Sequence, residues 1–270
     1  MVATRERVPH VPLTAEEIAD DAERCFAAGA TVVHLHARDA AGRPDWRREA
    51  TAELVVEVRR RCPGIVVCAT TSGRDVADVD RRADVLALEG EARPDMASLT
   101  LGSLNFSTGP SVSAIATVHE LARRMAAAGI RPELEVFDLG MAHLAHRLVR
   151  DGLAPAPRYA NLMLGFPNGA PADARSLVAL VDALPPGTAW AAAGLGDFQL
   201  PANALAVAMG GHVRTGLEDN PLLDGEPATN EALVARAAVL GLAAGRRLAT
   251  PAEARALLSV DPVREEAAAG

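Results

Sequence analysis

The sequence contains no lysine, so its 27 basic side chains are all arginines. A Schiff-base mechanism needs a lysine amine, and a Walker-type phosphate loop ends in Gly-Lys. The missing lysine therefore excludes imine-forming aldolases, amine-catalysed decarboxylases, pyridoxal-phosphate enzymes and P-loop proteins. Any carbon–carbon chemistry of this chain has to rely on a metal.

Aromatic residues make up only 3% of the chain, and the net charge is −8 with no basic stripe. Binding to nucleic acid requires clustered cations and exposed aromatic rings, so we expect no nucleic-acid partner. Long apolar runs are also missing, since no stretch approaches the roughly 20 residues of a membrane span. The first 13 residues contain Arg5, Arg7, Pro9 and Pro12, unlike a signal peptide. We expect a cytoplasmic protein without a membrane partner.

Cysteine is scarce, with three residues and no C-x-x-C spacing. Cys25 lies in a helical pattern and Cys68 in an apolar strand pattern. We therefore expect buried, reduced thiols without a redox role.

Short apolar segments alternate with helical patterns along the whole chain. Thr14 to Glu17 has the sequence of a capping box and begins the first helical pattern, which ends near Gly29. The predicted strands cover residues 31–37, 65–71, 96–101, 134–138, 161–166, 189–195 and 211–217. Further helices are predicted over 48–61, 76–88, 112–128, 142–150, 173–184, 203–208, 230–244 and 251–258. Short, continuously apolar strands that alternate with helices are typical of parallel βαβ units.

A chain of 270 residues has the usual length of one α/β barrel. We therefore expect a (β/α)8 TIM barrel as a single domain over residues 1–270, with residues 263–270 as a frayed tail. Only seven strands are evident. The eighth would have to precede the helix at Thr14, where Pro9 and Pro12 disfavour a central strand. The predicted barrel has a first strand that is short or missing, with no regular strand in residues 1–10.

Three residues have the pattern of a metal site. His34 and His36 are two positions apart in a predicted strand, so their imidazoles point to the same face. Glu218 ends the last predicted strand, at even spacing from His212, and would complete a His₂Glu set with an open position, as catalytic zinc sites have. In barrel numbering these are the second and eighth strands, whose side chains can meet inside the barrel. The alternatives are packed histidines and an acidic helix cap.

Other predicted strand ends contain polar side chains, which are unusual in a hydrophobic core. Their hydroxyls, amides and carboxylates could bind a substrate carboxylate or, taken singly, serve ordinary turns. These residues are Thr70, Ser98, Thr100, Asn105, Glu135 and Asp138. We interpret the histidines outside the site as surface residues, namely His10, His119, His143 and His146.

The ordered blocks of the chain resemble the β-keto acid cleavage enzymes. The resemblance covers residues 9–258. It is carried by Val33-His-Leu-His-Ala-Arg-Asp39, Ala69-Thr-Thr-Ser-Gly73, Glu133-Leu-Glu-Val-Phe-Asp138 and Gly211-His-Val-Arg-Thr-Gly-Leu-Glu-Asp-Asn220, together with Met96-Ala-Ser-Leu and Leu104-Asn-Phe106. The H-x-H block and the G-H-x-R-x-G-x-E-D-N block together are specific.

The resemblance implies a zinc-dependent barrel that forms homo-oligomers. It implies that a β-keto acid and acetyl-CoA are converted into acetoacetate and a new acyl-CoA. By the match, zinc bound to His34, His36 and Glu218 would polarise the keto group. Arg214 and Asp219 would form the proton-transfer pair. Substrate contacts would come from Thr70, Ser98 and Thr100, and Thr100 replaces an Asn of the aminohexanoate enzyme.

Two other functions stay open at the level of sequence. A metal-dependent hydrolase of the amidohydrolase type also uses H-x-H on a strand, but it adds histidines at later strand ends. The predicted strands at 134–138 and 161–166 contain none. The second is a non-catalytic barrel that binds small acids.

Overall fold

A curled parallel sheet forms the centre of the computed structural model, which describes residues 3–106 and 109–260. Seven strands follow one another in the order β1-β2-β3-β6-β7-β8-β9. They are β1 (Val32–Leu35), β2 (Val66–Ala69), β3 (Met96–Thr100), β6 (Arg131–Val136), β7 (Arg158–Leu164), β8 (Thr188–Gly194) and β9 (His212–Val213). The predicted α/β architecture with seven strands is confirmed.

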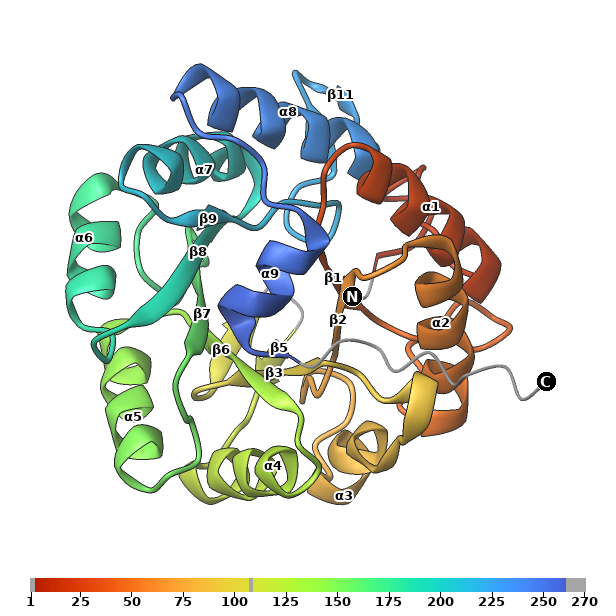
Figure 1. Ribbon diagram of the computed structural model, residues 1–270, viewed down its shortest axis with the longest axis vertical. Coiled ribbons are helices and arrows are strands. Elements are labelled where there is room, and N and C mark those ends of the chain that lie inside the picture. The colour runs from red at the N-terminus through yellow and green to blue at the C-terminus, as the bar shows by residue number, and fades with distance from the viewer. Residues whose placement is uncertain (1–2, 107–108, 261–270) are drawn as a thin grey trace.

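Helices surround the sheet as a ring (Figure 1). They are α1 (Ala15–Ala27), α2 (Arg48–Arg61), α3 (Val79–Ala83), α4 (Ile115–Ala127), α5 (Leu139–Arg150), α6 (Ala174–Asp182), α7 (Gln199–Ala208) and α8 (Asn230–Ala243). Short 3₁₀ turns are η1 (Asp84–Ala87), η2 (Gly90–Ala92) and η3 (Gly196–Phe198). The predicted capping box is present, since Glu17 N donates to Thr14 Oγ1 and Thr14 N to the Glu17 carboxylate. No helix in the described part of the chain is long and apolar enough to cross a membrane.

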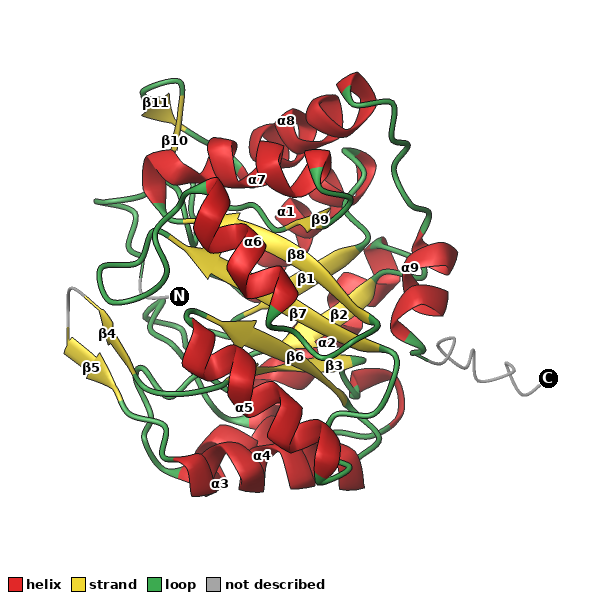
Figure 2. Cartoon of the chain, turned by 90° about the vertical axis from the view of Figure 1, so that its left-hand side faces the viewer, coloured by secondary structure: helices red, strands yellow, loops and turns green. Residues whose placement is uncertain are grey.

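The last helix, α9 (Pro251–Leu258), lies across the amino-terminal end of the sheet (Figure 1). Buried Arg255 fixes it there, because its guanidinium donates to the Asp95 carboxylate at 2.7 Å and to the Ile65 carbonyl at 3.3 Å. Asp95 also forms an ion pair with Arg59 at 3.1 Å and accepts from the amide of Val67. The hairpin of β4 (Leu104–Phe106) and β5 (Gly109–Ser111) lies at the opposite, carboxyl end (Figure 2).

The sheet is open, and β1 and β9 are its two edges. Residues 3–10 form turns in place of a strand, with the amides of Arg7 and Val8 donating to the Thr4 carbonyl. The prediction of an interrupted barrel therefore agrees with the residues described. The predicted tail at 263–270 lies outside them.

A cavity of about 390 Å³ follows the gap between the two edge strands. Its walls come from both edges, from α1 and α8, and from Leu257 and Leu258 of α9. At one side, Trp190 of β8 packs on Gly211, where a Cβ would come within 2.3 Å of the indole ring. Only glycine fits at this position, so the indole fixes the start of β9.

Several element ends differ from the predictions. The strand predicted at 134–138 begins at Arg131, because Arg131 and Pro132 already pair with Met96 and Ala97 of β3. The strand predicted over 211–217 is only two residues long, and β10 (Leu222–Leu223) and β11 (Glu226–Pro227) form an unpredicted hairpin after it. The three cysteines are buried and unpaired, as predicted.

Candidate metal and acyl-transfer site

The three predicted metal ligands lie together at the carboxyl end of the gap. His34 is in β1 and His36 follows that strand by one residue. Their Nε2 atoms are 3.0 Å apart. Glu218 Oε1 lies 3.2 Å from His36 Nε2, and Oε2 lies 4.0 Å from His34 Nε2. All three side chains are less than a quarter exposed.

These separations fit a single small cation. Tetrahedral zinc with bonds of about 2.0–2.2 Å to nitrogen and oxygen places its ligand atoms roughly 3.3 Å from one another. The three side chains offer one atom each within 4.8 Å of one another, on the wall of the cavity. The donor set of two imidazoles and one carboxylate is the type that leaves a catalytic position open.

Glu218 reaches the histidines through a loop. We expected an extended strand to carry His212, Arg214 and Glu218 on one face, and this expectation was wrong because β9 ends at Val213. The chain then turns at Gly216, whose φ of 153° is one that L side chains rarely adopt. His212 lines the cavity but lies outside the ligand group.

The loop is held by α8 and α1. The Asn230 side chain accepts from Leu217 N at 2.8 Å and donates to Asp21 of α1 at 2.6 Å. This network fixes the loop that carries Glu218.

Buried Arg214 joins the carboxylates of the site. Its Nη2 donates to Glu218 at 2.9 Å and its Nε to Asp219 at 3.1 Å. Its Nη1 is buried, makes no hydrogen bond, and lies 3.6 Å from Glu135 Oε1. Glu135 in turn accepts from the Thr100 hydroxyl at 2.6 Å. Three carboxylates (Glu135, Glu218 and Asp219) thus lie within 4 Å of one guanidinium.

Burial separates the pKa values of the site. It lowers the pKa of His36 to about 3, which leaves the ring neutral and able to bind a metal. Burial also raises the pKa of Asp219 and of Glu135, although Arg214 opposes both shifts. For Glu218, the neighbouring His36 and Arg214 outweigh burial and hold its pKa well below the usual range.

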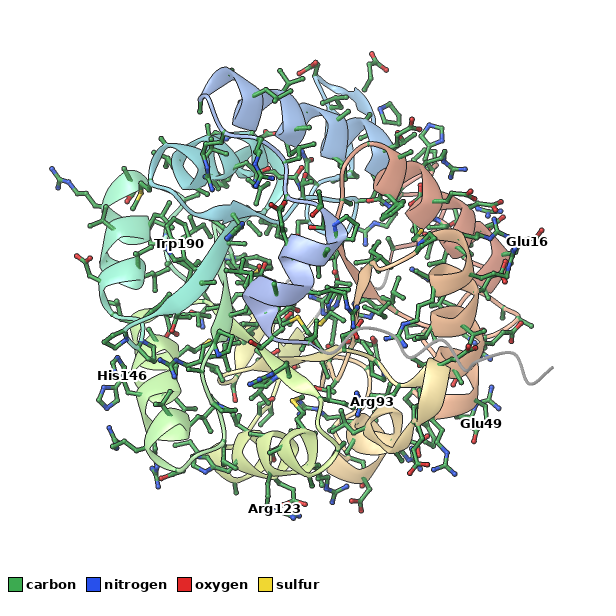
Figure 3. The ribbon with its side chains drawn as sticks, viewed as in Figure 1. Glu16, Glu49, Arg93, Arg123, His146 and Trp190 are labelled. Atoms are coloured by element: carbon green, nitrogen blue, oxygen red, sulfur yellow. The ribbon has the colours of Figure 1, made fainter. Side chains whose placement is uncertain are left out.

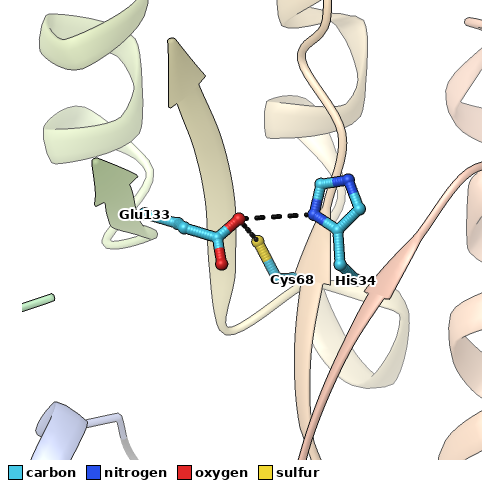
Figure 4. A group of neighbouring side chains, drawn as sticks. All are labelled: His34, Cys68 and Glu133. Atoms are coloured by element: carbon cyan, nitrogen blue, oxygen red, sulfur yellow. Dashed lines mark hydrogen bonds and ion pairs between the residues drawn. The ribbon is translucent and has the colours of Figure 1, made fainter. Parts of the chain in front are cut away.

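A second polar cluster lies deeper in the barrel and was not predicted as part of the site. Glu133 of β6 approaches His34 Nδ1 at 3.3 Å and accepts from the Cys68 thiol at 3.3 Å (Figure 4). Asn161 of β7 donates to the other carboxylate oxygen at 2.5 Å. The available signal was a Glu and an Asn within otherwise apolar strands, where unpaired polar groups are costly.

The predicted substrate-binding residues fall into two groups. Thr70, Ser98 and Thr100 are at or near the carboxyl ends of β2 and β3, beside the site. Ser98 is buried and its Oγ accepts from Thr71 N. Asn105 is exposed in the β4–β5 hairpin. Asp138 caps α5 by accepting from Met141 N at 2.8 Å.

The other histidines lie away from the site. His10 and His143 are exposed. His119 is partly buried 3.6 Å from Asp151, and His146 bonds the Ala183 carbonyl at the rim of the molecule (Figure 3).

A family model described as beta-keto acid cleavage enzyme matches residues 1–260. The chain belongs to this family. It is 36% identical to a 3-keto-5-aminohexanoate cleavage enzyme of Fusobacterium nucleatum, over 95% of the chain and 93% of that protein. It is also 38% identical to a 3-oxoadipate:acetyl-CoA acetyltransferase of Cupriavidus necator, over 93% of the chain and 89% of that protein. Family membership makes this chain an enzyme of the kind that cleaves carbon–carbon bonds by acyl transfer.

The fold of this chain is similar to that of a solved structure. The apo structure of ObcA superposes with a TM-score of 0.82 at 21% identity, over 93% of this chain and 66% of that one. At this identity the likeness concerns the fold alone.

Proposed function

We propose that this protein is a zinc-dependent β-keto acid cleavage enzyme. The observation that carries the proposal is the His34, His36 and Glu218 group beside the buried Arg214–Asp219 pair, in a member of this family. The names of two relatives, a 3-oxoadipate:acetyl-CoA acetyltransferase and a 3-dehydrocarnitine:acetyl-CoA trimethylamine transferase of Rhizobium meliloti, support acetyl-CoA as the co-substrate.

In the proposed reaction, a keto acid R–CO–CH₂–COO⁻ and acetyl-CoA give acetoacetate and R–CO–CoA. The bond between the keto carbon and C2 breaks, and C2 forms a new bond to the acetyl carbonyl. The R–CO group ends on the CoA sulfur. Atoms balance without an oxidant or reductant.

Zinc, when bound, would supply Lewis acidity for the keto oxygen. Asp219 would accept a proton from C2, and burial suits it to that role by raising its pKa. Arg214 would orient Asp219 through its Nε. Its buried, unpartnered Nη1 offers a donor to an anionic substrate oxygen.

Substrate contacts are proposed for Thr70, Ser98, Thr100, Asn105 and Asp138. The Thr100 hydroxyl faces the buried Glu135 carboxylate, beside Arg214. For Asn105 and Asp138 the proposal rests on the sequence pattern.

The test combines metal content with turnover. Protein purified without added metal should contain one zinc per chain by elemental analysis. A panel of β-keto acids should then reveal one that consumes acetyl-CoA and releases acetoacetate. The His34→Ala, His36→Ala double variant should lose both zinc and turnover. Full metal occupancy in that variant would contradict the assignment of His34 and His36 as zinc ligands. Binding of keto acids without acetyl-CoA consumption would instead indicate the non-catalytic barrel.

We also propose that the enzyme works in the cytoplasm as a homo-oligomer. An outward stripe on α8, formed by Ala235, Val239 and Leu242, supports the oligomer because Val239 and Leu242 are 64% and 61% exposed. Light scattering should give a mass of at least two chains, and Val239→Glu should lower it. A monomer in the unchanged protein contradicts this proposal.

A further inference from the structure

Glu133 is a buried carboxylate that the proposed proton transfer does not use. It is 2% exposed, on the inward face of β6. One oxygen, Oε1, accepts a short hydrogen bond of 2.5 Å from Asn161 Nδ2. The other, Oε2, lies 3.3 Å from both Cys68 Sγ and His34 Nδ1. Figure 4 shows one carboxylate oxygen in contact with both the thiol and the imidazole.

The two ring nitrogens of His34 face different neighbours. Nε2 points to His36 and Glu218, the other members of the ligand group. Nδ1 is buried and makes no hydrogen bond with the described residues, and the Glu133 carboxylate lies beside it at 3.3 Å. A neutral imidazole carries one proton, so the neighbour of Nδ1 decides which nitrogen keeps a free lone pair.

We propose that Glu133 is a positioning residue that keeps the proton of His34 on Nδ1 and thereby leaves Nε2 free to bind the metal. A carboxylate only accepts hydrogen bonds, so it favours the Nδ1–H form over the form protonated on Nε2. Metal-binding histidines generally donate their second N–H to such a partner. The inference rests on the proposed zinc site.

The surroundings of Glu133 require a carboxylate at this position. Asn161 Oδ1 accepts from the Tyr159 hydroxyl at 3.1 Å, which orients the amide so that its NH₂ group faces Glu133. A glutamine at position 133 would have to turn its oxygen to Asn161, because two NH₂ groups cannot share a 2.5 Å contact. Its own NH₂ would then donate to His34 Nδ1 and push the proton to Nε2.

The experiment compares two isosteric variants on the same strand. Glu133→Gln should weaken zinc affinity by about 10- to 100-fold, the usual effect of losing a partner of a metal-bound histidine. Glu135→Gln is the matched control. It removes a carboxylate from the same face of β6, two residues away, but Glu135 contacts Thr100 and Arg214, not His34. Its zinc affinity should stay within about threefold, below the lower bound for losing such a partner. Equal losses in the two variants would mean that charge alone matters and would overturn the proposal.

A measurement on the unchanged protein tests the proton position directly. Long-range ¹H–¹⁵N spectra of the zinc-loaded protein should show His34 protonated on Nδ1. Metal bound to Nδ1 would overturn the proposal, as would two zinc ions per chain with one lost in Glu133→Gln. Should that variant not fold without metal, Glu133→Asp serves in its place. It keeps the charge but withdraws it from Nδ1, and an unchanged zinc affinity would contradict the role. Failure of the unchanged protein to bind zinc would reject the proposed function instead.

Discussion

At the scale of single residues, Asp219 and Arg214 form an ion pair with two proposed roles. Asp219 accepts the proton, and Arg214 orients Asp219. Asp219 is 5% exposed and bonded to Arg214 Nε at 3.1 Å, so its orientation is fixed before substrate arrives. The same guanidinium bonds Glu218, so the pair is attached to the proposed metal group without belonging to it.

We predict that Asp219→Asn keeps the fold and the zinc but lowers kcat by about 10²- to 10⁴-fold, because the amide cannot accept the proton. Steady-state kinetics with metal analysis on the same sample would measure both effects. Asp173→Asn, on the cap of α6 and outside the site, is the control and should leave kcat nearly unchanged. Near-normal turnover of Asp219→Asn would contradict its role as the base.

Sequence patterns predicted the ligand group because His34 and His36 lie two positions apart at one strand, and Glu218 lies in one short motif. They did not predict the Glu133 cluster. Glu133, Cys68 and Asn161 come from three strands, and nothing within one strand indicates that their side chains meet. That contact depends on sheet register, in which His34 pairs with Cys68, and on curvature, neither of which leaves a local signal.

At the scale of elements, the strands were predictable because their apolar runs are continuous, whereas their ends depended on tertiary pairing. Helix α9 illustrates the second case. Its attachment to the barrel depends on Asp95, a loop residue before β3 that accepts from Arg255 and the amide of Val67 and forms an ion pair with Arg59.

We predict that Asp95→Ala destabilises the protein by about 3–5 kcal/mol, because it removes the carboxylate shared by the buried Arg255 and the half-buried Arg59. The melting temperature should fall by roughly 5–15 °C. Glu120→Ala is the control, since it removes an exposed ion-pair partner of Arg123 and should change the melting temperature little. Equal decreases in melting temperature in the two variants, measured by calorimetry, would show that Asp95 contributes no more to stability than the carboxylate of an exposed ion pair.

At the scale of the whole molecule, the described residues form a sheet of seven parallel strands, one fewer than a closed barrel has. The backbone carbonyls of Thr31 and Leu35 accept hydrogen bonds from the amides of Val66 and Thr70, on the side of β2. Backbone groups of successive residues in a strand point to opposite sides, so the amides and carbonyls of Val32 and His34 face the gap. Each buried backbone group without a partner costs about 1–3 kcal/mol, against a total stability of about 5–15 kcal/mol. We therefore expect that filling the gap stabilises the protein next to the proposed zinc site.

We predict that an N-terminal extension designed as an apolar parallel strand raises both the melting temperature and the zinc affinity. Hydrogen exchange of the Val32 and His34 amides should slow at the same time. An extension of equal length with proline at alternate positions cannot pair with the edges and is the control. If both extensions behave alike, the gap does not bind a strand.

The contact between Trp190 and Gly211 gives the protein a built-in optical reporter. The chain has two tryptophans, and the other, Trp46, is 39% exposed in a loop beside Arg81. In a Trp46→Phe variant, fluorescence would come from Trp190 alone, on the strand next to the open edge (Figure 3). Its emission should move to longer wavelength when β9 separates from β8 and water reaches the indole, so loosening of this edge strand could be followed in real time without a label.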